Sequence, residues 1–353
     1  MLRSISAALG RCVGSVSLAI ALSACSTAAA QQDWSQPVRL PPPPATTSLV
    51  TQQPATSLPI ANDNIVILRE PVETSSCAMA TAPWGANERL FDNVSVFGGL
   101  DGSKQPQDFG VNAQFGGRAS VNWGIPLFES AGVGAQIGTA IDATGDAVQV
   151  VERTLGSKGR TQSFTTVGLF QRLENGWSWG LAYDFLYENY YDTFNLGQWR
   201  FNVSYQLSPR NTIGVWSAIA SQSDQGHFGV IPVTLTPITQ TNAYFKHIWD
   251  YGVQTTFWCG LANSHGQVNA VLGDLQPVRT PFVFGSELLI PLTDRLAIFG
   301  QGNFMMPASS GVVDSYLGIA FYPRGGARTV AAQRYSPLQT VAAPTNFAVD
   351  LRR

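Results

Sequence analysis

Few residues of this chain have types and spacing that could carry out chemistry. The histidines are His227, His247 and His265, and the run Asn263-Ser264-His265 places a serine beside the last of them. A serine hydrolase built in a barrel needs Ser and His to face each other from different strands, and adjacency in the sequence does not supply that geometry. We therefore predict that the protein is not an enzyme.

Motifs for cofactors and metals are equally weak. The glycine-rich run at residues 132–138 is one residue out of step with a dinucleotide-binding loop, and strand-like alternation continues through it without a helix. No spacing of Cys, His or carboxylates is typical of a metal site, and Asp142 and Asp146 are expected to be solvated loop residues. The sequence predicts neither a cofactor nor a bound metal.

A set of charged residues on the polar faces of apparent strands is more informative. They are Arg118, Asp184, Glu188, Arg200, Glu287 and Asp314. Charges at membrane depth persist only where they are paired or hydrated. Two interpretations stay open: a polar pore lined by opposed charges, or a salt-bridged and hydrogen-bonded plug that stabilises a barrel. Mixed signs predict weak ion selectivity at best.

The elements that must position these residues are strands with two different faces. Over residues 111–125 the odd positions are mostly apolar and the even positions are mostly polar or glycine, and segments 177–188 and 198–207 repeat the alternation. Large aromatic residues such as Trp123 and Trp177 lie towards the ends of the apolar faces, as in the interfacial girdles of a membrane barrel. The polar faces are rich in Gly, Ser, Asn and Gln. This pattern favours a transmembrane barrel over a soluble β-sandwich, which alternates with its apolar face inward.

The fold class we predict is all-β, an antiparallel transmembrane outer-membrane β-barrel of about 12 strands. The strands are expected near residues 94–101, 109–125, 132–142, 161–173, 177–188, 196–207, 212–222, 241–249, 252–262, 281–290, 295–305 and 312–322. Short turns alternate with longer connections, including 189–195 and 223–240, which is the asymmetry of bacterial outer-membrane barrels. With an even number of strands, both termini should lie at the short-turn, periplasmic end.

Composition agrees with an envelope location. Only 12% of the residues are charged, while 11% are aromatic, so something other than a charged surface faces the surroundings. A net charge of -2 leaves no basic stripe for nucleic acid. The expected partners are outer-membrane lipid and the barrel-assembly machinery, and the sequence assigns no oligomeric state.

The N-terminus predicts export. Arg3 and Arg11, an apolar run and small residues form a signal peptide over residues 1–30, cleaved either before a lipidated Cys25 or after Ala30. A proline-rich leader follows over 31–92, then the barrel over 93–323 and a C-terminal tail over 324–353. A disulfide between Cys77 and Cys259 is allowed in an oxidising envelope, with two unrelated thiols as the alternative.

Several segments look like outer-membrane hairpins: FGVNAQFGGRASVNWGIPLF (109–128), GVGAQIGTAI (132–141), YQLSPRNTIGVW (205–216) and IPLTDRLAIFGQGNF (290–304). They resemble an uncharacterised family of predicted barrels from planctomycete-type bacteria and, more loosely, the translocator barrels of inverse autotransporters. The resemblance covers residues 93–323 and implies a fold and a location, but no catalytic residues. It differs from the usual outer-membrane pattern because some thirty residues follow the expected closing strand.

These features lead to a small-solute channel or a structural envelope component as the expected function. The alternatives are an anchoring or adhesion barrel without transport, and a soluble secreted β-sandwich. The connection 223–240 carries many apolar residues, so we expect it to fold across the outer mouth and pack against the barrel wall. The other possibility is a hairpin that extends its flanking strands.

Overall fold

A computed structural model describes residues 92–108, 112–148, 158–263, 280–306 and 312–352. All of them belong to the second of two compact units, Thr74–Arg353. The expected signal peptide, the candidate lipidation residue Cys25, Cys77 and almost all of the leader lie outside the described residues, as does His265. No helix among the described residues is long and apolar enough to cross a membrane.

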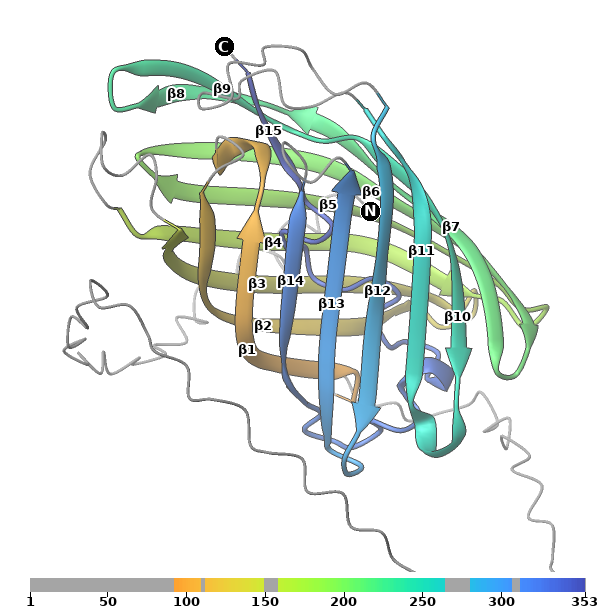
Figure 1. Ribbon diagram of the computed structural model, residues 1–353. Coiled ribbons are helices and arrows are strands. Elements are labelled where there is room, and N and C mark those ends of the chain that lie inside the picture. Colours follow the sequence, from red (N-terminus) through yellow and green to blue (C-terminus); the bar gives the residue numbers. More distant parts are fainter. Residues whose placement is uncertain (1–91, 109–111, 149–157, 264–279, 307–311, 353) are drawn as a thin grey trace, which may run out of the picture. The chain divides into compact units, whose positions relative to one another are not determined.

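Twelve strands of the described chain close into one antiparallel barrel (Figure 1), as the alternation predicts. Around the barrel the order is β1-β14-β13-β12-β11-β10-β7-β6-β5-β4-β3-β2, and closure joins β1 to β14. A closed barrel excludes the two-sheet sandwich. The strands are β1 (Val94–Lys104), β2 (Ala113–Phe128), β3 (Val133–Val148), β4 (Arg160–Arg172), β5 (Trp177–Tyr190), β6 (Asp192–Ser208), β7 (Asn211–Gln222), β10 (Gln240–Ile248), β11 (Gln254–Ala262), β12 (Phe282–Pro291), β13 (Leu296–Met306) and β14 (Val313–Phe321).

The two faces of each strand differ in burial because side chains alternate across the sheet. On β5 the side chains of Asp184, Leu186 and Glu188 point inward and are fully buried, whereas Tyr187 points outward and is exposed. Large apolar side chains are exposed around the outside of the barrel: Val121, Ile141, Val167, Leu169, Phe201, Val203, Val215, Ile219, Phe245, Phe257, Phe284 and Leu317. An apolar exterior with a polar interior is the arrangement a closed sheet adopts in lipid.

A charge placed on the outer face tests this assignment. Phe185 lies mid-strand on the outer face of β5, and Asn189 lies on the same face close to the end of the strand. We expect Phe185→Arg to lower the free energy of unfolding by about 2 to 4 kcal/mol in a lipid bilayer, and Asn189→Arg by at most about 1 kcal/mol, because the penalty for a lipid-facing arginine falls towards the interface. Denaturant titration of both variants in bilayers measures the difference. Equal penalties would contradict a lipid contact at Phe185.

The lengths of the connections differ between the two ends of the barrel. Short turns join β2 to β3, β4 to β5, β6 to β7, β10 to β11 and β12 to β13, whereas most connections at the opposite end are longer. The expected long connection over 189–195 is wrong: β5 ends at Tyr190, β6 begins at Asp192, and Tyr191 alone makes the turn with a φ of 32°. We call the two ends the short-turn end and the long-loop end.

At the long-loop end a small second sheet covers the barrel. Strands β8 (Asp224–Phe228) and β9 (Ile231–Pro237) form a hairpin, and β15 (Val349–Arg352) pairs with the free side of β9, in the order β15-β9-β8 (Figure 1). Phe228, Val233 and Leu235 are buried in an apolar cluster that includes residues of the barrel wall. The packing expected for residues 223–240 is confirmed, although the hairpin belongs to its own sheet and does not extend β7 and β10.

The residues after β14 do not leave the barrel as a free tail. Ala327 bonds to Asp294 in the turn between β12 and β13, and Arg334 lies against Arg172 at the end of β4, so the chain first stays at the short-turn end. It then passes through the interior, and its last described residues form β15 at the long-loop end. The prediction that both termini lie at the short-turn end is therefore wrong for the C-terminus. An even strand number fixes only where the last barrel strand ends, and here the chain crosses the barrel once more.

Two inward-facing glycines make room for this crossing. A Cβ atom on Gly124 of β2 would collide with the carbonyl oxygen of Tyr335, and one on Gly138 of β3 would collide with the side chain of Val341. Glycine is the residue that allows backbone and neighbouring groups to approach so closely. The interior wall is therefore shaped for the segment it contains.

Candidate functional site: the barrel lumen and its contents

The segment that fills the lumen is residues 334–352, called here the lumenal segment. Every residue from Val341 to Leu351 is buried. Side chains of the wall donate hydrogen bonds to its backbone carbonyls all along its path: Arg172 to Arg334 and Ser336, Asn122 and Gln136 to Gln339, Arg200 to Thr340, Arg118 to Ala342, Gln105 to Pro344 and Gln198 to Asn346. Backbone groups removed from water need such partners, so the wall holds the backbone of this irregular segment.

Arg118 forms the first of three buried ion pairs. Its Nη1 donates to both carboxylate oxygens of Asp142, at 2.8 and 2.6 Å, and its Nη2 donates to the carbonyl oxygen of Ala342 at 2.7 Å. Arg118 and Asp142 lie directly opposite each other on β2 and β3. The expectation that Asp142 is a solvated loop residue is wrong, because β3 continues to Val148 and carries Asp142 inside.

Arg200 and Asp184 form the second pair, and both belong to the set selected from the sequence. The Arg200 Nε lies 2.8 Å from the Asp184 Oδ2, and its Nη2 donates to the Thr340 carbonyl oxygen at 2.8 Å. Asp184 also accepts hydrogen bonds from Thr166 at 2.8 Å and from Gln198 at 3.0 Å. Such networks are stable in a low dielectric only when the charges are paired and bonded.

Arg160 forms the third pair with Glu188 and Asp108, close to the long-loop end. Its Nε lies 3.0 Å from the Glu188 Oε1, its Nη1 lies 3.4 Å from the Asp108 Oδ1, and all three side chains are fully buried. Asp108 belongs to a short 3-10 helix, η1 (Pro106–Asp108), between β1 and β2. Burial raises the pKa of Asp108 to about 6, although the charge of Arg160 opposes the shift.

The remaining two selected residues are separate from these pairs. Asp314 is fully buried and accepts a hydrogen bond from Gln105 Nε2 at 3.0 Å, and Gln105 Oε1 in turn accepts one from the backbone of Val349. Glu287 lies nearer the short-turn end, half-buried, and accepts a hydrogen bond from Gln301 at 3.3 Å. The six selected residues thus all face the interior but do not form one cluster.

The half of the lumen nearer the long-loop end contains apolar as well as charged side chains. Three wall residues pack against the lumenal segment in one buried cluster: Phe164, Leu186 and Phe194. From the segment the cluster includes Val341 and Phe347, and from the β8–β9 hairpin it includes Leu235. The inward faces of the strands are mostly polar in the sequence, yet this half of the interior also contains a buried apolar cluster. The packed side chains therefore surround the segment in this half of the barrel.

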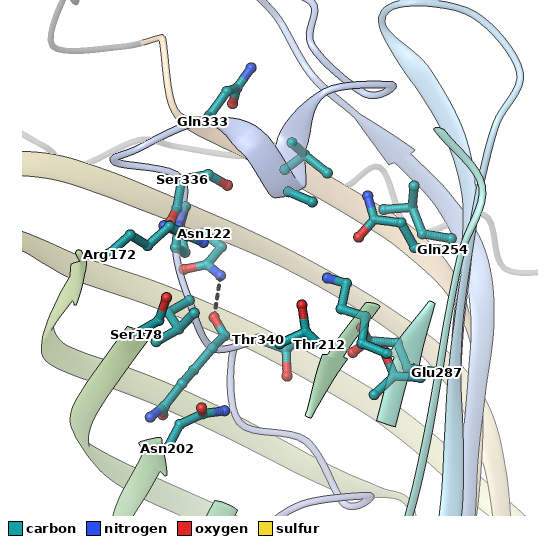
Figure 2. A pocket seen from close by; sticks show the side chains of 18 of the residues that line it. Asn122, Arg172, Ser178, Asn202, Thr212, Gln254, Glu287, Gln333, Ser336 and Thr340 are labelled. Carbon is teal, nitrogen blue, oxygen red and sulfur yellow. Dashed lines mark hydrogen bonds between the residues drawn. The ribbon is translucent and has the colours of Figure 1, made fainter. Parts of the chain in front are cut away.

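The lower part of the lumen is an open vestibule at the short-turn end. This cavity has a volume of about 1710 Å³, and residues of the lumenal segment such as Gln339 and Thr340 line its inner end, away from the short turns. Figure 2 shows Gln254 and Glu287 on one side of the vestibule and Arg172, Ser178 and Asn122 on the other, with Ser336 on the same side as Arg172. Among the described residues, no group of three or more His, Cys, Asp or Glu side chains is arranged to hold a metal ion.

A closed antiparallel barrel with an apolar outer surface and a polar, ion-paired interior is a transmembrane barrel of the outer-membrane class. This chain belongs to a family of unknown function, DUF6666, whose model matches residues 93–349. The matched range includes both the barrel and nearly all of the lumenal segment, so the segment is part of the module that the family shares. No curated protein matches the chain.

Solved structures of similar fold are outer-membrane barrels. The KdgM porin has a TM-score of 0.38 at 5% identity, with 64% of this chain and 98% of that chain covered. The β domain of the Bordetella autotransporter BrkA has a TM-score of 0.38 at 9% identity, covering 65% and 99%. An active-site mutant of outer membrane phospholipase A from Escherichia coli has a TM-score of 0.38 at 7% identity, covering 67% and 95%. At these values the likeness concerns architecture alone.

Proposed function

We propose that this protein is a structural component of the outer membrane, a barrel that spans the membrane without conducting. The observation that carries the proposal is the lumenal segment, which is held by three wall arginines, Arg118, Arg172 and Arg200, and buried without interruption from Val341 to Leu351. Of the two interpretations left open by the sequence, the charged residues in this proposal stabilise a plug and do not line a pore.

Different parts of the chain lie at the two ends of the barrel in this proposal. In outer-membrane barrels the short turns face the periplasm. We infer that Val94 begins the barrel on the periplasmic side, where the leader over 31–92 would reach other envelope layers, with Cys25 lipidated or removed. The C-terminus would lie at the cell surface beside the β8–β9 hairpin. An anchoring role fits this arrangement better than solute transport, and neither role calls for catalysis.

Accessibility of tags in intact cells tests the arrangement. We expect an epitope added after Arg353 to be labelled on intact cells, and one inserted between Ala45 and Thr46 to be labelled only after the outer membrane is permeabilised. Heat-modifiable gel mobility checks that both tagged proteins fold. Labelling of the leader epitope on intact cells, or protection of the C-terminal epitope, would contradict the proposed orientation.

A further inference from the structure

The vestibule is a blind pocket. Its mouth is at the short-turn end, and the lumenal segment closes it from above with the backbone and side chains of residues 336–341. The segment lies across the inner end of the cavity, so we expect a molecule that enters to be retained there. At about 1710 Å³ it is larger than the pockets that usually hold small ligands.

Most of the lining is uncharged. Hydroxyl and amide side chains line it together with apolar ones, and the charged residues of the short turns belong to the mouth. Inside, Arg118 and Arg200 are paired with carboxylates, and Arg172 donates to the carbonyl oxygens of Arg334 and Ser336. Arg328 and Arg334 belong to the chain after β14, so Lys246 and Glu287 are the charged side chains of the barrel wall that remain.

Lys246 and Glu287 sit at the same level of the barrel with one strand between them. Lys246 on β10 is opposite Thr256 on β11, and Thr256 is opposite Glu287 on β12. Two strand spacings separate their backbones by about 10 Å. In the part of the chain that the structure describes, no ion pair joins them and no hydrogen bond holds the Lys246 ammonium, while Glu287 accepts one from Gln301.

Two aromatic side chains and one amide side chain line the cavity near Lys246 and Glu287. Tyr244 donates to Asn202 and Trp258 donates to Asn303, so the polar atoms of these two rings are already bonded. Towards the mouth, the buried side chain of Gln254 has an Nε2 with no hydrogen-bond partner among the described residues. A buried amide donor without a partner is a position that a ligand oxygen can satisfy.

From these observations we propose that the vestibule binds a small zwitterion, an amino acid or a short peptide. Its carboxylate would bind Lys246 and Gln254, its ammonium would bind Glu287, and the body of the ligand would lie against Tyr244 and Trp258. Opposite charges held apart in a partly buried site favour a ligand that carries both charges, because a singly charged ligand leaves one of the two groups unpaired.

Calorimetric titration of the full-length protein in detergent micelles tests the proposal. Alanyl-alanine and alanine are the zwitterionic probes, and N-acetyl-alanyl-alanine amide, propionate and ethylamine are the matched controls that lack one or both charges. We expect at least one zwitterion to bind at least about tenfold more tightly than every control, as the loss of one charged hydrogen bond predicts. Equal binding of the capped peptide, or no binding of either zwitterion, overturns the proposal.

Substitutions separate the site from the rest of the barrel. Lys246→Met and Glu287→Gln should each weaken zwitterion binding by about tenfold or more. Arg210→Met is the matched control, because Arg210 is a cation at the same end of the barrel whose partner, Asp250, is exposed outside the vestibule. If Arg210→Met weakens zwitterion binding as much as Lys246→Met, any cation at this end of the barrel attracts the ligand carboxylate, and the assigned site is wrong. The ligand series on the unaltered protein decides the question even if a variant fails to fold.

Discussion

Removal of the lumenal segment is expected to turn a silent barrel into a conducting one. In planar bilayers the full-length protein should give no steps of current, because we propose that the lumenal segment, packed around Phe347 and hydrogen-bonded to Arg118 and Arg200, blocks the aqueous path. A chain that ends at Gln333 keeps every barrel strand and the turn contacts of Ala327 but loses the segment. The freed interior keeps the polar and charged side chains of the wall beside the apolar Phe164, Leu186 and Phe194, and the polar part of the wall supports a water-filled pore.

A point substitution tests the same idea with the full chain. Gly138→Leu places a side chain where Val341 lies, so the segment must shift and conduction should appear at least intermittently. Gly145→Leu is the matched control: it lies on the same strand, and a Cβ there would meet nothing within 4 Å. Steps of current from the full-length protein, or a folded truncation that stays silent, would show that the segment is not what closes the barrel.

The strands could be predicted from the sequence because their physical cause is local. Alternation between apolar and polar residues places one face towards lipid and the other towards the interior, and a turn such as Asn175-Gly176 marks a strand end. The selected charged residues faced inward for the same reason. Their partners were harder to find, because pairing depends on strand register and on strand length beyond the membrane. The sequence predicts a strand end at Asp142, whereas β3 continues to Val148 and carries Asp142 inside the barrel.

The lumenal segment had no signal of that kind. Residues 334–346 do not alternate, and the apolar side chain of Val341 is stabilised by wall residues such as Phe164, far away in the sequence. A segment surrounded by a barrel wall on all sides needs no polar face, so the period that identifies a strand is absent. The inward glycines Gly124 and Gly138 were visible, but glycine is common on barrel strands, and only the structure shows what approaches them.

The tight turn at Tyr191 was missed for a different reason. A single non-glycine residue with a positive φ is an uncommon turn, and glycine or asparagine is the usual marker. Here Tyr191 packs against Tyr190 and Phe228, with ring centroids 4.4 and 5.3 Å apart, and the ring contacts stabilise the conformation. Tertiary packing therefore replaced the local turn signal.

The buried pair network at the long-loop end should show the largest loss of stability from a single substitution. Arg160→Met removes the cation and leaves the carboxylates of Glu188 and Asp108 buried together without it. Breaking a buried ion pair from one side lowers the free energy of unfolding by about 3 to 5 kcal/mol. Arg210→Met, which breaks an exposed pair, should lower it by at most about 1 kcal/mol. Denaturant titration in detergent or lipid measures both values.

The pH dependence of the stability penalty shows whether Arg160→Met acts through the lost charge or through lost packing. The pKa of Asp108 is about 6 with Arg160 present, and removing that cation raises it further because a stabilising charge is lost. A carboxyl group whose pKa is raised by folding destabilises the protein above that pKa, and the penalty fades as the pH falls towards the unfolded value. The penalty of Arg160→Met should therefore be larger at pH 8 than at pH 5, and Asp108→Asn combined with Glu188→Gln should recover most of it. A penalty that stays constant with pH and resists this rescue would mean that Arg160 acts through its packing against Tyr190 and not through its charge.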